Sequence, residues 1–293
     1  MVTKMRVVCV ATLGLLVQVG PLDAQTATKN YAQELVDNAL ARHRDVLVLM
    51  MHVTPPGKSE NVVIASNIGR IGKAADEDDL AVIKTGQAKL EVNKTGDRFE
   101  VELPLQDVSQ RTIGALGIVF PYSNGQDQGV CQRKAEQIRN ELRRRISTAA
   151  NLVEPADWDP KIPKHTYAQT LVDQALDQHP DALILAMHVT PPNSQQNVIV
   201  ASNIGRIGKK ADEDDMSVIT TGAPKLEVNA TGDRFEDELA LLDASGNRVG
   251  AIGIVFAYRR GDDQAALAKK AEQIRDELRG KIRSRAQLFE PAQ

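Results

Sequence analysis

A stretch of 15 residues occurs twice in the chain, as ASNIGRIGKAADEDD at residues 65–79 and as ASNIGRIGKKADEDD at residues 201–215. The two versions differ at one position, where Ala74 corresponds to Lys210. A repeat of this length and fidelity indicates that a whole structural unit has been copied. The position of this repeat therefore shows how the rest of the sequence divides into domains.

The match extends outward from this stretch without a gap. Residues 31–156 align with residues 167–292 at a constant offset of 136, and 79 of the 126 aligned positions are identical. Solenoid repeats are about 20–50 residues long, so this period indicates a duplicated domain. Pro160 and Pro163 predict an extended, stiff linker between the copies. The expected organisation is a signal peptide at 1–24, copy 1 at 27–156, a linker at 157–166 and copy 2 at 167–292.

The composition is that of a folded protein with a weak overall charge. Of the 293 residues, 42% are hydrophobic and 26% are charged, and the formal net charge is −3. These values argue against global disorder and give no basic field that would attract nucleic acid. Cys9 lies in the predicted leader, so Cys131 stands alone in the rest of the chain. A disulfide framework and a cysteine-rich metal site are therefore excluded.

The first 24 residues have the pattern of a secretory signal. Lys4 and Arg6 precede an uncharged, mostly apolar run at 7–20, and Ala24 offers a small residue for cleavage. The run has 14 residues, whereas a membrane span needs about 20. We therefore expect a cleaved signal, with an uncleaved anchor as the alternative, and a soluble protein that is periplasmic or secreted.

Each copy carries the same succession of helix and strand patterns. In copy 1, helical spacing of apolar residues alternates with short apolar runs typical of strands. The turn at residues 94–97 predicts a hairpin. We expect an α+β fold in which each copy is a five-stranded, mainly antiparallel sheet flanked by N- and C-terminal helices. The expected elements of copy 1 are a helix at 31–44, strands at 46–53 and 61–66, a helix at 75–84, strands at 89–93, 98–106 and 113–122, and a helix at 126–149.

Three segments of this succession resemble the PAS-like extracytoplasmic sensor domains called Cache or PDC domains. The first is the opening helix that leads into a buried strand. The second, IASNIGRIGK at 64–73 and its counterpart at 200–209, is similar to the strand-then-RIGK element of citrate and C4-dicarboxylate sensor kinases. The third is LLDASGNRVGAIGIV at 241–255, which resembles the final strands of PAS-like sheets. The resemblance implies two tandem PAS-like domains, each with a ligand pocket bordered by the RIGK loop.

The repeated stretch also carries the candidate anion site. Asn67, Arg70 and Lys73 lie between a predicted strand and a predicted helix N-terminus, where free N–H groups and two cations suit a carboxylate. The alternative is that Arg70 pairs with the acidic run at 76–79 on the surface. In copy 2 the corresponding candidates are Asn203, Arg206 and Lys209.

His52 and His188 complete the candidate ligand-binding residues. Each ends an apolar strand just before Thr-Pro-Pro, where it would line a pocket, ligate haem or a metal, or make a hydrogen bond in the core. No other ligand type stands at metal-ligand spacing from His52, so we expect no metal site. The acidic run at 76–79 lacks the calcium-loop spacing and is explained as the start of a helix. No nucleophile–base–acid motif is found, so we expect no catalytic residues and no cofactor.

Together these patterns predict an exported, non-enzymatic protein that binds or senses a small, anionic metabolite and acts with a membrane receptor or transporter. Two alternatives stay open. One is an enzyme or a haem-handling protein that uses His52 and His188. The other is an interaction module whose two copies pack as a pseudo-two-fold pair without a ligand. Nucleic acid is not an expected partner.

Overall fold

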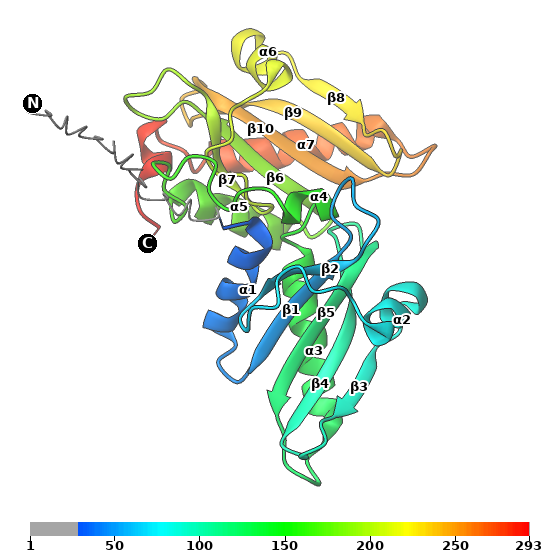
Figure 1. Cartoon of the computed structure of the whole chain (residues 1–293). Coiled ribbons are helices and arrows are strands. Elements are labelled where there is room, and N and C mark those ends of the chain that lie inside the picture. Colours follow the sequence, from blue (N-terminus) through cyan, green and yellow to red (C-terminus); the bar gives the residue numbers. More distant parts are fainter. Residues whose placement is uncertain (1–28, 293) are drawn as a thin grey trace, which may run out of the picture.

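The computed structural model describes residues 29–292, which form two tandem α+β domains (Figure 1). Each domain contains one five-stranded sheet in which every strand pair is antiparallel, so the predicted fold class is confirmed. The predicted signal peptide at 1–24 lies outside the described residues. Within residues 29–292, no helix combines the length and the apolar character that crossing a membrane requires.

The two domains repeat the same order of elements. The sheet order is β2-β1-β5-β4-β3 in copy 1 and β7-β6-β10-β9-β8 in copy 2. Copy 1 consists of α1 (Tyr31–Arg42), β1 (Val48–Val53), β2 (Val62–Ser66), α2 (Glu77–Thr85), β3 (Lys89–Val92), β4 (Arg98–Gln106), β5 (Thr112–Pro121), α3 (Gln128–Arg143) and α4 (Ala149–Leu152). Copy 2 consists of α5 (Tyr167–Gln178), β6 (Ala182–Val189), β7 (Val198–Ser202), α6 (Glu213–Thr221), β8 (Lys225–Val228), β9 (Arg234–Leu242), β10 (Arg248–Ala257), α7 (Gln264–Arg279) and the 3-10 helix η1 (Ala286–Phe289).

The two faces of each sheet are covered very differently. In copy 2, the long helices α5 and α7 bury one face in the main apolar core, which includes Phe235, Leu239 and Leu241 of β9. On the opposite face the short helix α6 packs through Val218 on Ala240 and Ala251. Because strand side chains alternate between faces, the remaining residues of β9 on the α6 side lie outside the main core. This second face is where a cavity forms.

The three predicted helices of copy 1 have different limits in the structure. The helix expected at 31–44 ends at Arg42. The helix expected at 75–84 begins later, at Glu77, because Asp76 is its N-cap, and it ends before Gly86 in the left-handed conformation. The helix expected at 126–149 ends at Arg143. The chain then turns and forms α4, whose N-cap is Thr148. Ser/Thr at such a cap favours a new helix start over continuation of the old one.

The two copies pack on each other head to tail. We call residues 67–72 and 203–208 the head loops, and residues 144–154 and 280–290 the tail segments. The tail segment of copy 1 lies against the head loop of copy 2: Glu154 accepts two hydrogen bonds from Arg206, at 2.8 and 2.9 Å. Asn151 donates to the carbonyl of Ile204 at 3.1 Å.

The arrangement of the copies differs from a pseudo-two-fold pair. A two-fold interface uses the same surface on both partners. Here Tyr31 donates to Arg145 in its own domain and also reaches the carbonyl of Asn203 in copy 2. Its counterpart Tyr167 makes the equivalent bond within its domain, to Lys281, and no bond to copy 1 among the described residues. The alternative of a pseudo-two-fold pair is therefore wrong, although the copies do pair within the chain.

The linker also differs from the expected extended rod. It contains a turn closed by a hydrogen bond from Ile162 N–H to the carbonyl of Asp159. Lys164 ties it to copy 1 through Glu34 and the carbonyl of Ala156. The linker is consequently packed between the domains. The prolines restrict their own φ angles, but contacts with copy 1 determine the direction in which the linker runs.

Candidate functional site

A cavity of about 470 Å³ lies in copy 2, on the sheet face that carries α6. This volume falls within the range of about 300–1,000 Å³ that is typical of small-molecule sites. Its walls come from the sheet and α6, and copy 1 adds Ser147 and Thr148. Ionisable groups of both signs line it: Arg206, Lys209, Lys210, Lys225, Arg234, His188, Asp212, Asp214, Asp215, Glu227, Glu236 and Glu238.

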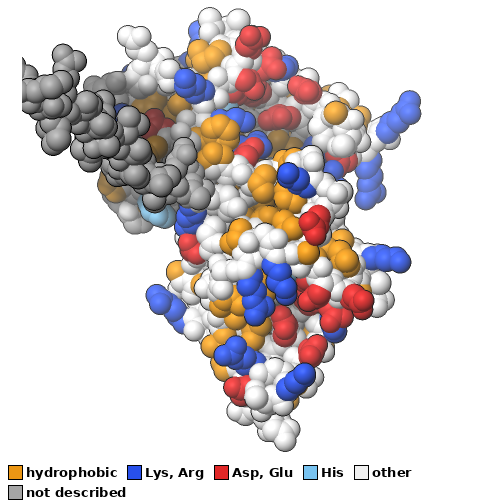
Figure 2. Space-filling view, in the orientation of Figure 1, with side chains coloured by type: hydrophobic (Ala, Val, Ile, Leu, Met, Phe, Trp, Pro, Cys, Tyr) orange, Lys and Arg blue, Asp and Glu red, His pale blue; other side chains and the backbone are white. Residues whose placement is uncertain are grey.

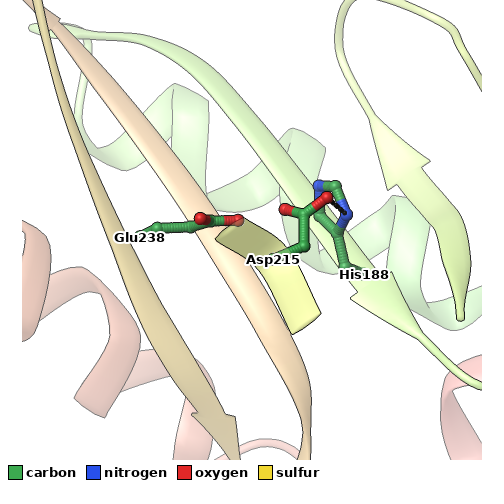
Figure 3. A group of neighbouring side chains, drawn as sticks. All are labelled: His188, Asp215 and Glu238. Atoms are coloured by element: carbon green, nitrogen blue, oxygen red, sulfur yellow. Dashed lines mark ion pairs between the residues drawn. The ribbon is translucent and has the colours of Figure 1, made fainter. Parts of the chain in front are cut away.

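Three of these side chains form a buried cluster (Figure 3). His188 comes from β6, Asp215 from α6 and Glu238 from β9, and one ligand atom of each lies within 4.8 Å of the others. The Nδ1 atom of His188 is 3.0 Å from Oδ2 of Asp215 but has no well-directed hydrogen-bond partner. The carboxyl group of Glu238 points toward Asp215 from the other side (Figure 3).

The backbone explains why these side chains converge. His188 follows Ile184 and Ala186 on the cavity face of β6, and a register irregularity between Met187 and His188 in the pairing with β7 lies beside it. Such bulges redirect strand side chains and are common beside functional sites. Asp215 is the third residue of α6 and its carboxylate accepts from the Asp212 N–H at 2.8 Å.

The cluster holds a proton at neutral pH. Burial and the hydrogen bond with Asp215 raise the pKa of Glu238 to about 9. For Asp215, burial acts to raise the pKa, but the imidazole of His188 at 3.0 Å and the hydrogen bond with Glu238 outweigh it and hold the pKa well below its ordinary value. Glu238 is therefore the protonated acid and Asp215 the carboxylate that accepts from it.

Copy 1 has His52, Asp79 and Glu102 at the corresponding positions, but the group whose ligand atoms lie within 4.8 Å of one another there is Asp76, Asp79 and Glu102. The Nδ1 atom of His52 lies 3.3 Å from Oδ2 of Asp79. Burial, followed by the hydrogen bond with Asp79, raises the pKa of Glu102 to about 9. Burial lowers the pKa of His52, which favours the neutral imidazole.

The donor set is one that a divalent cation can use. One imidazole and two carboxylates in His188, Asp215 and Glu238 suit zinc, manganese or iron. Sequence spacing did not indicate this set, because its members meet only through folding. Coordination would require the proton of Glu238 to leave, so affinity would rise with pH.

The sequence-predicted residues of copy 2 separate into two groups. His188, Arg206 and Lys209 line the cavity. Asn203 does not, because its amide bonds to the backbone of Leu185, Leu183 and Arg144. The bidentate pair with Glu154 occupies the guanidinium of Arg206, while Lys209 places its Nζ 5.4 Å from the ring centre of Trp158.

In copy 1 the same residues lie on an open surface. Asn67 bonds to the backbone of Leu49 and Leu47, as its counterpart does in copy 2. Arg70 and Lys73 are exposed. Arg70 adopts a left-handed φ of 66°. The structure thus brings His52, Asp79 and Glu102 together but leaves Arg70 and Lys73 in the solvent-exposed head loop and just beyond it.

The helix starts that were expected to bind an anion are already capped. Asp76 and Asp212 accept hydrogen bonds from the first free N–H groups of α2 and α6. A carboxylate in that position neutralises the positive end of the helix. The expectation that these helix N-termini offer free N–H groups is therefore wrong, and any anion must be bound by side chains.

Sequence reasoning missed Asp215 and Glu238. A signal for Glu238 was present in the alternation of β9, where Glu236 and Glu238 occupy the face opposite Phe235 and Leu239. The signal for Asp215 was weaker. It lies three residues before Val218 on α6, which places both on the side that faces the sheet.

No protein-family model matches the chain. No curated protein matches it either.

Solved structures with a similar arrangement include sensor and ligand-binding domains. The GAF domain of A. Aeolicus nlh2 is 13% identical and matches over 40% of this chain and 85% of that chain, with a TM-score of 0.32. The inducer-binding domain of PobR from Acinetobacter, in complex with 3-hydroxybenzoic acid, is 12% identical over 42% of this chain and 98% of that chain, with a TM-score of 0.27. PelD from Pseudomonas aeruginosa is 14% identical over 87% of this chain and 79% of that chain, with a TM-score of 0.27. These values assign no ligand to this chain.

Proposed function

We propose that copy 2 binds a small polar metabolite that carries a carboxylate, and that the protein acts as a sensor or binding protein rather than an enzyme. The observation that carries this proposal is the cavity of about 470 Å³, which is lined by Lys209 and Lys210 and by the buried cluster of His188, Asp215 and Glu238. Small-molecule sites combine a concave volume of this size with a few polar groups that fix the orientation of the ligand.

Two lysines supply the cationic end of the cavity. Neither Lys209 nor Lys210 forms an ion pair among the described residues, whereas Lys225 pairs with Asp214 and Glu227. Lys210 is also the one position at which the repeated stretches differ, since copy 1 has Ala74 there. Copy 2 therefore has a cation that copy 1 lacks. A carboxylate near these lysines would leave the rest of the ligand facing His188 and Glu238.

Export and a membrane partner are the further parts of this proposal. The leader pattern at 1–24 supports export to the periplasm or secretion. The RIGK element supports a Cache-type or PDC-type sensor that passes its state to a membrane receptor or transporter. The mixed charge of the surface in Figure 2 suits a soluble domain with no single-sign field.

A thermal-shift screen of dicarboxylates, amino acids and aromatic acids tests the proposal. A ligand at 100 times its Kd adds about 2.7 kcal/mol of stability, which gives a clear rise in melting temperature. We expect Lys210→Ala to reduce the shift and Lys73→Ala, the control in copy 1, to leave it unchanged. If no compound raises the melting temperature, or if Lys209→Ala and Lys210→Ala together leave the shift intact, the proposal fails.

A divalent cation in the same cluster is the second candidate, favoured by the donor set of His188, Asp215 and Glu238. Zinc or manganese should then raise the melting temperature of the parent protein and not of His188→Ala, more strongly as pH rises. Haem is not favoured. The residues that line the cavity include no aromatic side chain, and His188 faces a carboxylate.

A further inference from the structure

One surface of this protein is buried in copy 2 and open in copy 1. Ile204 and Ile207 of the copy 2 head loop are each 5% exposed, whereas their counterparts Ile68 and Ile71 are 44% and 59% exposed. The sequence of the two head loops is identical. The difference in burial therefore comes from the parts of the chain that cover copy 2, which are Tyr31, Val108, the copy 1 tail segment and the linker.

The glycines of the head loops show the same difference. A Cβ atom on Gly205 would lie 2.5 Å from the Tyr31 ring, and one on Gly208 would lie 2.6 Å from the backbone N of Asp159. At Gly69 and Gly72 nothing lies within 4 Å. The head loop of copy 1 thus keeps a shape that fits a close partner, while no described residue fills that place.

The open head loop also keeps unused polar groups. The amide of Asn203 donates both to Leu183 and, across the interface, to the carbonyl of Arg144. The side-chain amide of Asn67 donates to the carbonyl of Leu47, and among the described residues it has no second acceptor. Arg70 likewise has no carboxylate partner among them, although its counterpart in copy 2 is held by Glu154.

The matching surface is the tail of copy 2. Glu290 corresponds to Glu154 and is exposed, with its side chain free of ion pairs within residues 29–292. Asp243 and Ser245 correspond to Asp107 and Ser109, which hold the guanidinium of Arg234 in the internal interface. Arg70 and Glu290 are therefore an arginine and a carboxylate that match the internal pair of Arg206 and Glu154. The copy 2 tail segment also carries Lys281, Arg283 and Arg285, where copy 1 has Arg145, Ser147 and Ala149.

We propose that the copy 1 head loop is a docking site for the copy 2 tail segment of a second molecule of this chain. The contact repeats the tail-segment part of the internal interface, with Arg70 on Glu290 in place of Arg206 on Glu154. Such an interface is heterologous, so repeated use generates a ring or a filament rather than a closed two-fold dimer. This inference does not depend on the ligand of copy 2.

Sedimentation velocity of the full chain over a wide concentration range tests this. We expect the parent to form larger species as its concentration rises. Arg70→Glu and Ile71→Asp should each remain monomeric. Leu90→Asp is the control and should associate like the parent, because Leu90 and its counterpart Leu226 are both exposed, at 40% and 49%. Circular dichroism checks that each variant is folded.

Mixing identifies the partner surface. Arg70→Glu has a damaged head and an intact tail, whereas Glu290→Arg has an intact head and a damaged tail. Each alone should be monomeric, and an equimolar mixture should associate. A parent that stays monomeric at every concentration, an Arg70→Glu variant that associates like the parent, or a mixture that remains monomeric would each overturn the proposal.

Discussion

Glu238 is the residue whose protonation makes the stability of this fold depend on pH. Its ordinary pKa of 4.5 is raised to about 9, first by burial and then by the hydrogen bond with Asp215. Between these values the folded protein binds a proton that the unfolded chain has lost. Stability from this group is therefore complete below about pH 4.5 and declines as pH rises to about 9.

We expect Glu238→Gln to remove this decline. Glutamine keeps the hydrogen bond to Asp215 but has no titrating proton. The melting temperature of the variant should therefore exceed that of the parent by an amount that grows from pH 5 to about 9. Thermal unfolding at a series of pH values measures the difference. Glu227→Gln, which changes an exposed residue of β8, should run parallel to the parent. Parallel curves for Glu238→Gln as well would show that Glu238 is not protonated.

The corresponding strands β4 and β9 differ at one position that faces the apolar core. β4 places Val101 in the core beneath α3, and β9 places Asp237 at the same position. Asp237 is 1% exposed, its Oδ1 has no hydrogen-bond partner, and burial raises its pKa to about 7. β9 therefore carries an unsatisfied polar group that β4 avoids.

Asp237→Val, the residue of copy 1, should stabilise the protein. Removing an unsatisfied buried group is worth about 1–3 kcal/mol. The folded pKa is raised, so the parent loses stability as pH rises from about 4 to about 7, and the gain should be largest above pH 7. Urea unfolding at pH 5 and pH 8 measures it. Asp237→Asn should lose the pH dependence but keep the unsatisfied group. A less stable Asp237→Val would mean that α7 requires the carboxyl group.

The elements were predictable from sequence where the signal is local. The alternation of apolar and polar residues in β4, the hairpin turn at 94–97 and the glycine after α2 predicted correctly which segments are helices or strands and in what order they occur. The site was not, because Asp215 and Glu238 are 23 positions apart and meet only when α6 packs across β9. The end of α3 was also missed, since Thr148 signals a cap only once the chain has turned.

At the scale of the whole molecule, identical sequence has two different environments. Nothing local in the head loops distinguishes Ile71 from Ile207, and the burial of one and exposure of the other follow from the order of the copies alone. The head-to-tail arrangement therefore lay beyond sequence reasoning. Figure 1 shows its result: two similar domains whose contact surfaces are not equivalent.

Alanine substitutions at two equivalent glycines, one inside the interface between the copies and one outside it, test how tightly this interface is packed. Gly69 and Gly205 have left-handed φ angles of 78° and 72°, so alanine is strained at both. We expect Gly69→Ala to lower the free energy of unfolding by about 1 kcal/mol. Gly205→Ala should lower it by about 1–3 kcal/mol more, because its methyl group collides with Tyr31. Urea unfolding measures the values. Equal losses would show that Tyr31 yields without loosening the copies.

Trp158 makes the packed linker observable by intrinsic fluorescence. It is the only tryptophan of the sequence, its backbone N–H bonds to the carbonyl of Ile207 at 3.4 Å, and the Lys209 ammonium lies over its ring. Trp158 therefore contacts the interface between the copies through its backbone and the cationic edge of the cavity through its ring. Any molecule that draws Lys209 inward changes the field at the indole. The intrinsic fluorescence of the unlabelled protein thus reports on occupancy and on domain separation at once.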